Sequence, residues 1–144
     1  MIRKMCTMDV EQVAAMEKTI FSDPWSEQSF EHSIKASQNL YLVVEEKNRI
    51  LAYCGLWKVA DEGQICNVAV KEDERGRGLA TMMLSELLKQ GCEMGIKAFT
   101  LEVRAGNAPA IWVYKKLGFE TAGVRKNYYT KPDEDALIMW YYPK

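Results

Sequence analysis

The sequence predicts a single α/β domain of the α+β kind, with a mixed and mostly antiparallel central sheet flanked by helices. Its 144 residues are of single-domain length, and 48% of them are apolar, which is enough for one core. The apolar pattern indicates strand, two helices, three-strand meander, helix, strand, helix and two strands. This order excludes a doubly wound dinucleotide-binding fold, which would alternate strand and helix from the start. We expect one domain over residues 1–144.

The chain should begin with a strand over Ile2–Cys6, followed by a helix with Thr7 as its N-cap. This helix should lie on the sheet, because one of its faces has apolar residues at helical spacing. The residues that define this face are Val10, Val13, Ala14, Glu17 and Ile20.

A second helix should follow the break at residues 22–26, Ser-Asp-Pro-Trp-Ser. Ser26 is the expected N-cap, and Trp25 and Phe30 occupy the N′ and N4 positions of a hydrophobic staple. Trp25 therefore has a structural role, and a contact with a ligand is compatible with that role.

Residues 40–70 predict an antiparallel meander of three strands, because the connections between the apolar runs are short. The strands are Leu40–Glu45, Ile50–Val59 and Gln64–Val70, with turns at residues 47–49 and 61–63.

The stretch over residues 67–81 passes from an apolar run through a glycine-rich turn into a helical segment. Gly76 and Gly78 allow backbone N–H groups to converge, and the helix that follows adds its partial positive charge at the same place. Arg75 and Arg77 can add charge-assisted contacts. The stretch predicts a phosphate-binding loop suited to a pyrophosphate, with an ordinary surface turn as the alternative.

Two other phosphate-binding motifs do not fit this loop. A Walker-type P-loop requires a lysine after its second glycine, and no lysine follows Gly78. The dinucleotide fingerprint requires a third small residue where Thr81 stands, although Glu102 lies at a suitable distance for a ribose contact.

The helix after the loop should end at Gly95, and Lys97–Val103 is the next strand. One helix joins this strand to Gln64–Val70, so the two should pair in parallel through a right-handed crossover. A loop over residues 104–107 then leads into a helix that carries a proline in its first turn and stops at Gly118.

Two strands should close the chain, Phe119–Val124 and Ala136–Tyr142. The segment between them, residues 125–133, is polar and is expected to connect them outside the sheet.

Composition argues against several classes of protein. The formal net charge is −1 with both signs interspersed, which gives no footprint for nucleic acid or for an anionic membrane. No apolar run approaches a membrane span and the first residues lack a signal-peptide core, so we expect a cytoplasmic protein. Four dispersed cysteines and the single His32 indicate neither a zinc site nor a disulfide framework. We expect buried free thiols and no metal.

The loop motif Arg75-x-x-Gly78-x-Ala80 resembles the Arg/Gln-x-x-Gly-x-Gly/Ala motif of the GCN5-related N-acetyltransferase (GNAT) family, and the order of elements is similar over the full length. In that family the loop holds the pyrophosphate of acetyl-coenzyme A (acetyl-CoA). A bulge in the fourth strand splays it from the fifth, and the pantetheine arm lies in the gap. The resemblance implies a GNAT fold and a set of acetyl-CoA-binding residues: Val68, Ala69, Val70, Arg75, Gly76, Arg77, Gly78, Leu79, Ala80, Thr81 and Asn107.

The resemblance is more specific over four segments: residues 23–27, 101–107, 114–119 and 125–129. They look like the bacterial branch of the family that acetylates the N-terminal alanine amine of a small-subunit ribosomal protein. Gly106 stands where serine is common in that branch, and Trp112 where a small aliphatic residue is common. Neither position carries a catalytic role there.

The same resemblance implies Glu102 as general base and Tyr114 as general acid, with the acceptor held by Trp25, Tyr128 and Tyr129. Amide formation from a thioester needs a proton sink for the attacking amine and a proton source for the departing thiolate. A carboxylate and a phenol can fill these roles, since a tyrosine with a pKa of about 10 stays protonated above a thiol near 8.5.

Two alternatives stay open from the sequence. One is an acetyltransferase for another peptide amine or a small amine, and the other is a non-catalytic module that binds and senses coenzyme A. A sensor would need the loop but not an acid–base pair, so Glu102 and Tyr114 together favour an enzyme. The sequence does not indicate the oligomeric state.

Overall fold

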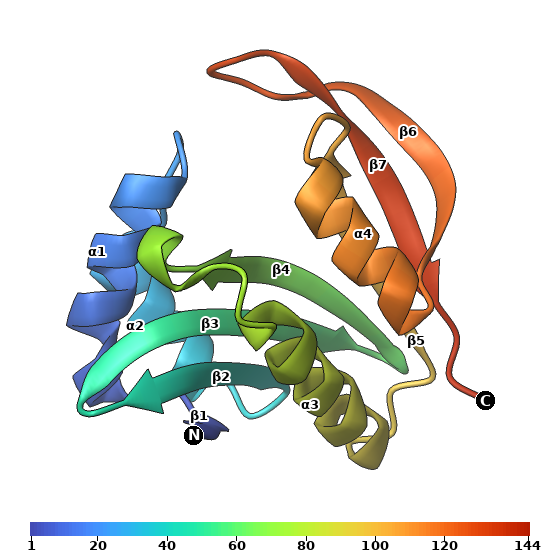
Figure 1. Ribbon diagram of the computed structural model, residues 1–144. Helices are drawn as coiled ribbons and strands as arrows, with labels where there is room; N and C mark the ends of the chain where they lie inside the picture. Colours follow the sequence, from blue (N-terminus) through green and yellow to red (C-terminus); the bar gives the residue numbers. More distant parts are fainter.

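The computed structural model describes all residues 1–144 and contains one seven-stranded sheet with helices on both faces (Figure 1). The strands are β1 (Ile2–Lys4), β2 (Asn39–Glu46), β3 (Arg49–Val59), β4 (Glu62–Val70), β5 (Ala98–Arg104), β6 (Glu120–Tyr129) and β7 (Glu134–Tyr141). The helices are α1 (Val10–Ile20), α2 (Glu27–Lys35), α3 (Leu79–Glu93) and α4 (Ala108–Leu117), with 3-10 turns η1 (Thr7–Asp9) and η2 (Glu72–Glu74). The strand order is β1-β2-β3-β4-β5-β7-β6, and of these neighbours only β4 and β5 are parallel. This confirms the predicted mixed, mostly antiparallel sheet.

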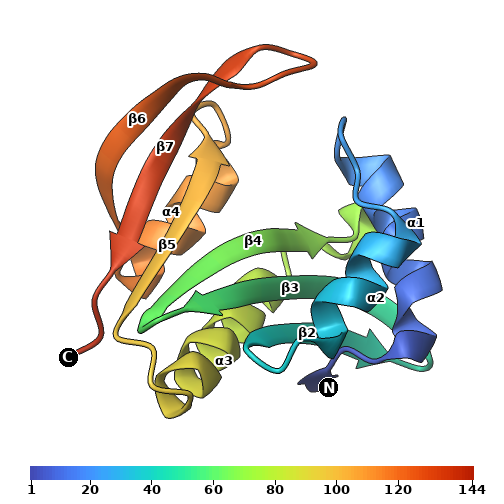
Figure 2. The same cartoon turned by 180° about the vertical axis from the view of Figure 1, so that it is seen from behind.

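The central strands are covered on both faces, so their side chains alternate between two cores. In β2, Leu42 belongs to the cluster under α3, and the next residue, Val43, belongs to the cluster under α1 and α2. Figure 1 shows α3 and α4 on one side of the sheet, and Figure 2 shows α1 and α2 on the other. Burial on both faces explains why β2 and β3 are almost continuously apolar. None of the helices is both long and apolar enough to span a bilayer.

The two N-terminal helices begin differently from each other. The prediction for α2 is confirmed: Ser26 Oγ accepts a hydrogen bond from Ser29 N at 3.1 Å, and the rings of Trp25 and Phe30 lie 5.3 Å apart. The prediction that Thr7 caps the first helix is wrong, because residues 7–9 form the turn η1 and α1 starts at Val10. Asp9 anchors this turn instead, since its carboxylate accepts from Cys6 N at 2.8 Å and pairs with Arg3.

The sheet opens between β4 and β5, as the family resemblance implied. The two strands pair only where Glu62–Gln64 lies beside Ala98–Thr100, and Figure 2 shows them diverging beyond that point. On its other side, β4 carries a bulge at Cys66, because Gly55 faces Asn67 while Leu56 faces Ile65. A bulge bends a strand and increases its twist. The bend directs the second half of β4 away from β5.

The C-terminal hairpin corrects the prediction for residues 125–133. The strand β6 does not stop at Val124 but continues to Tyr129, with Arg125 opposite Ala136 and Tyr129 opposite Glu134. The residues between these pairs bulge out, and Asn127, at φ 53°, donates its N–H to Asp135 at 2.9 Å. The hairpin therefore projects past the opening between β4 and β5 (Figure 1).

The four cysteines are free, but only Cys54 is buried. The expectation of buried thiols is therefore wrong for Cys6, Cys66 and Cys92, which are exposed. Cys66 lies between two buried residues of β4, Ile65 and Asn67, and its exposure follows the alternation of that strand.

Candidate active site

A cleft of about 580 Å³ occupies the opening between β4 and β5. Its walls come from these two strands, the start of α4, the connection between α1 and α2, and the end of the β6–β7 hairpin. Both predicted acid–base residues, Glu102 and Tyr114, line it, as do Trp25, Tyr128 and Tyr129. The structure thus brings five predicted site residues from distant parts of the chain to one cavity.

The edge of β4 that faces the cleft has free backbone groups. Lys71 N donates to Leu51 O of β3 at 2.8 Å, and because hydrogen-bonding direction alternates along a strand, Ala69 also faces β3. Val68 and Val70 must therefore direct their N–H and C=O groups into the gap. No strand pairs with them there, since β5 leaves β4 after Gln64, and of these groups only Val70 O has a partner, Arg75 Nε. This edge fits the extended amide-containing arm of coenzyme A.

The glycine-rich loop has the geometry of an anion site. Gly76 and Gly78 adopt positive φ angles of 84° and 77°, and a Cβ added to either would meet nothing within 4 Å. The first bond of α3 runs from Met82 N to Gly78 O at 3.1 Å. The preceding N–H groups, those of Leu79, Ala80 and Thr81, have no acceptor within the helix. Open space in front of these donors fits a pyrophosphate.

The two arginines of the loop are already engaged by the protein. Arg75 Nε donates to Val70 O at 3.2 Å, so its side chain folds back along the end of β4. Arg77 is paired with Glu74 and, at 3.2 Å, with Glu46, and these carboxylates raise the pKa of Arg77. Contacts from these arginines to a phosphate therefore require the side chains to exchange partners.

Glu102 lies on β5 and is half-buried, opposite Ile138 of β7. Its Oε2 lies 3.5 Å from Nε of Arg125, which comes from the part of β6 that sequence reasoning placed in a loop. The neighbouring Glu102 carboxylate, followed by burial, raises the pKa of the Tyr128 hydroxyl. A cation and a phenol of the hairpin therefore lie beside this carboxylate.

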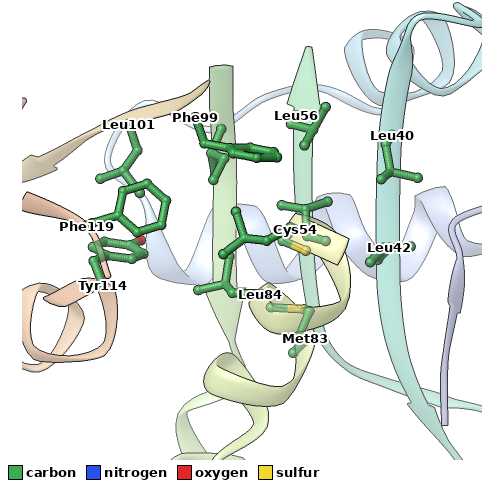
Figure 3. Close-up of a cluster of buried hydrophobic side chains, with 14 of the residues drawn as sticks. Leu40, Leu42, Cys54, Leu56, Met83, Leu84, Phe99, Leu101, Tyr114 and Phe119 are labelled. Atoms are coloured by element: carbon green, nitrogen blue, oxygen red, sulfur yellow. The ribbon is translucent and has the colours of Figure 1, made fainter. Parts of the chain in front are cut away.

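Tyr114 projects from α4 into the end of the core beside Phe119 and Leu101, as Figure 3 shows. The side chain is only 7% exposed, and it lines the cleft. Burial, followed by the neighbouring Tyr129, raises the pKa of the Tyr114 hydroxyl well above its ordinary value. The phenol is consequently protonated at every physiological pH.

Asn107 is the N-cap of α4, because its Oδ1 accepts from Ala110 N at 3.3 Å. It also lines the cleft, and no residue of the chain accepts a hydrogen bond from its amide nitrogen. The cap fixes the side chain while the amide NH₂ stays available for a ligand. Its structural role and the implied contact with coenzyme A are therefore compatible.

The residues predicted to hold the acceptor form two aromatic walls. Trp25 packs between Phe30 and Trp57, with ring centroids 5.3 and 5.9 Å away. On the opposite side, Tyr128 and Tyr129 meet edge to face at 5.0 Å. The guanidinium of Arg104 lies 4.5 Å from the Tyr129 ring, and burial raises the pKa of Tyr129 to about 12.

Sequence reasoning missed three residues of this site. Arg125 was placed in a connecting segment, and the buried Asn67 was passed over as part of an apolar strand. Glu17 was noted only as a member of the buried face of the first helix. A carboxylate on that face was itself a signal, since charged residues are almost never fully buried without a partner.

No group of three or more histidine, cysteine, aspartate or glutamate side chains is arranged to hold a metal ion. The chemistry available in the cleft is that of the carboxylates, the phenols and the free backbone groups described above.

The sheet is splayed, one strand edge in the opening is free, and the N-terminus of α3 has the geometry of an anion site. These features define a class of enzymes that hold an acyl thioester of coenzyme A between two strands. The model of the acetyltransferase (GNAT) family matches residues 10–119, and the chain belongs to this family. A Bacillus subtilis protein is 39% identical over 140 residues, which are 96% of this chain and 93% of its own.

Two further comparisons cover nearly the whole chain. The [ribosomal protein bS18]-alanine N-acetyltransferase of Salmonella typhimurium is 36% identical over 94% of this chain and 92% of its own length. The crystal structure of the ribosomal-protein-S18-alanine N-acetyltransferase from Escherichia coli superposes with a TM-score of 0.90 at 33% identity. That match covers 99% of this chain and 92% of the other. Both the family and the GNAT fold implied by the sequence motifs are thereby confirmed.

Proposed function

We propose that this protein transfers the acetyl group of acetyl-CoA to the α-amine of the N-terminal alanine of ribosomal protein bS18, in the cytoplasm. The observation that carries the proposal is one continuous cleft that holds the free edge of β4, the Glu102 carboxylate and the Tyr114 hydroxyl. The names of relatives that are similar over nearly their full length support the choice of acceptor. We also propose that residues 1–144 act as a single N-acetyltransferase domain.

Two parts of the chain are the proposed binding site for acetyl-CoA. The backbone groups of Val68 and Val70 take the pantetheine arm, and the N–H groups over residues 76–81 take the pyrophosphate. Asn107 adds a side-chain amide, and Arg75 and Arg77 add positive charge once they release their present partners. Ala69 contributes through the strand, since its own side chain is buried under α1.

Bound acetyl-CoA supplies an activated acyl carbon, and the chain supplies the proton transfers. Glu102 is the proposed base, acting through a water as the amine attacks. A weak base is sufficient, because an α-amine with a pKa of about 7.8 is already roughly one-third neutral at pH 7.5. Tyr114 is the proposed acid, with its hydroxyl donating to the departing sulfur. Because its pKa is raised, the hydrogen bond contributes more than complete proton transfer does.

The acceptor is proposed to enter between Trp25 and the Tyr128–Tyr129 pair. The two walls come from the α1–α2 connection and from the hairpin, and together they make a slot at the end of the splayed sheet. A small first side chain lets the amine approach the thioester closely, whereas a lysine would have to reach the same point with a long and mostly protonated arm.

The test compares kcat/KM for three acceptors, with products identified by mass. They are a bS18 N-terminal peptide that starts with alanine, the same peptide with a blocked terminus and a free internal lysine, and spermidine. We expect high, negligible and low values in that order, and Tyr128→Ala should lower the first without changing the affinity for coenzyme A.

Three results would overturn parts of this assignment. A blocked peptide that reacts as fast as the free one would reject acetylation of the N-terminus. Spermidine outrunning both peptides would indicate a small-amine acetyltransferase. Tight binding of acetyl-CoA without any product would indicate a sensor.

A further inference from the structure

Glu17 of α1 is a carboxylate buried without a cation. It is 3% exposed, Tyr53 donates its hydroxyl to Oε1, and Trp25 N donates to Oε2 at 3.1 Å. None of the ion pairs of the protein includes it, so no lysine, arginine or histidine nitrogen lies within 4 Å of its oxygens. Burying a charge in this way costs stability unless something compensates it.

The two hydrogen bonds do not by themselves require an acidic side chain at position 17. A glutamine at this position could accept from Trp25 N through its carbonyl oxygen and donate to the Tyr53 hydroxyl through its NH₂ group. It would hold the same neighbours and avoid the cost of burying an ion. Burial indeed raises the pKa of the Glu17 carboxyl, which shows that its surroundings in the protein disfavour the charged form. A buried carboxyl without a cation, placed at the wall of a cleft, can take a cationic partner from outside the chain, which a glutamine cannot do.

Glu17 lines the same cleft as Glu102 and Tyr114. Of the three carboxylates in its walls, Glu102 already has Arg125 as a cationic partner, and Asp23 is exposed to solvent. Glu17 alone is both buried and without a cation. A carboxylate offers about four lone-pair positions, of which the protein uses two in direct hydrogen bonds here.

The position of Glu17 matches the place where the acceptor must react. The cleft wall beside it includes Asn67 of β4, whose side chain partly opposes the effect of burial on the pKa of Glu17. Asn67 lies between the bulge at Cys66 and the free edge that begins at Val68. Trp25, which donates its N–H to Glu17, belongs to the wall proposed to hold the acceptor.

We propose that Glu17 is the anionic site that binds the α-ammonium group of the acceptor; this inference rests on the function proposed above. Most of a free α-amine is protonated near neutral pH, so the acceptor arrives as a cation. The Glu17 carboxylate receives this cation through its unused lone pairs and thereby gains the partner that the protein does not provide. Glu17 binds and orients the group as an ammonium. The nitrogen releases one proton to solvent before it attacks, and Glu102 accepts the second proton as the C–N bond forms.

The experiment separates the ammonium contribution from the rest of the peptide. Affinities are measured by calorimetry, with coenzyme A bound, for the alanine-starting peptide and for its des-amino analogue, in which a propionyl group replaces alanyl. In the parent protein the amine form should bind about tenfold or more tightly, which is about 1.4 kcal/mol. In Glu17→Gln the ratio should fall to about one, while the affinity for coenzyme A stays the same.

Tyr53→Phe is the matched control, because it removes a donor to the same carboxyl group but leaves that acidic group in place. It should keep the preference for the amine form. If Glu17→Gln does not fold, Glu17→Asp withdraws the carboxylate by one methylene and should reduce the ratio. A preference that survives in Glu17→Gln, or in Glu17→Asp where that replaces it, would overturn the inference, as would an equal loss for both peptides.

The inference and the proposed function can fail separately. If the parent acetylates the alanine peptide but binds both peptides equally, only the ammonium site is wrong. If the parent does not acetylate the peptide at all, the proposed acceptor is wrong, and the ammonium site is rejected with it.

Discussion

Arg125 of β6 reaches across β7 to Glu102 of β5, and Nε of the guanidinium lies 3.5 Å from Oε2 of the carboxylate. The arginine side chain is 57% exposed, so the pair contributes little to stability, in the range of about 0–1 kcal/mol. Its effect is geometric, because it holds the carboxylate toward the hairpin. The proposed base is therefore positioned by the same hairpin that forms one wall of the acceptor slot.

Glu102→Gln should lower kcat by about 10²-fold or more and leave the affinity for acetyl-CoA nearly unchanged. The glutamine keeps the size of the side chain but cannot accept the proton. The loss should shrink at high pH, where more of the peptide amine is already neutral. A pH series of kcat/KM checks this, and a loss that stays constant across the series would contradict the role of a base.

Tyr114→Phe should also lower kcat, by about 10-fold or more, since one charge-assisted hydrogen bond to the departing sulfur is lost. Raising the pH should not rescue it, because the defect lies in thiolate release and not in amine deprotonation. No residue of the chain accepts a hydrogen bond from the hydroxyl, so stability should change little. A variant that turns over like the parent would remove Tyr114 from the mechanism.

Gly78→Val should weaken binding of coenzyme A sharply, because a side chain at φ 77° is strained by about 1–2 kcal/mol and a Cβ would project into the open space before α3. The matched control is Gly95→Val, at φ 90° and equally free of neighbours, but past the far end of the helix. Calorimetry should find the affinity lost only at position 78. Equal affinities in the two folded variants would reject the pyrophosphate site.

Glu17→Gln should raise the free energy of unfolding at neutral pH. Burial raises the pKa of the Glu17 carboxyl in the folded parent above its value in the unfolded chain. The folded state is therefore stabilised while Glu17 is protonated, and this stabilisation is lost as the pH rises through the folded pKa. The advantage of the glutamine should therefore grow from about pH 4.3, the ordinary value of a glutamate, toward neutrality. Denaturant unfolding at several pH values measures it, and a difference independent of pH would contradict the assignment.

Much of the fold could be predicted because its signals are local. The meander, the crossover around α3 and the cap at Ser26 all follow from residues close together in sequence. The end of β6 was missed because residues 125–127 are polar, residues 125–128 are exposed, and such a strand carries no apolar alternation. Its strand conformation comes from pairing with β7, which no local pattern shows.

The residues of the candidate site also divide into those with local sequence signals and those that depend on tertiary structure. The loop over residues 75–81 and the proposed roles of Glu102 and Tyr114 were indicated by short motifs. The contact between Glu102 and Arg125 depends on the register of a bulged hairpin, and the isolation of Glu17 depends on which side chains surround it in space. Both are tertiary properties. A sequence can indicate that Glu17 is buried but not that it lacks a cation.

The narrow seam between β4 and β5 has a mechanical consequence. Three residue pairs of the sheet, the packing of α3 against α4 and one buried cluster that continues across the seam connect one body, built on β1–β4, to a second body, built on β5–β7. The second body is internally braced, because Arg104 at the end of β5 bonds the carbonyls of Thr130 and Pro132, each at 3.0 Å. Along the sheet itself, these three pairs alone join β4 to β5. A ligand strand inserted beside Val68 and Val70 would extend the backbone contact between the two bodies far beyond these three pairs. It would thereby stiffen the connection between them.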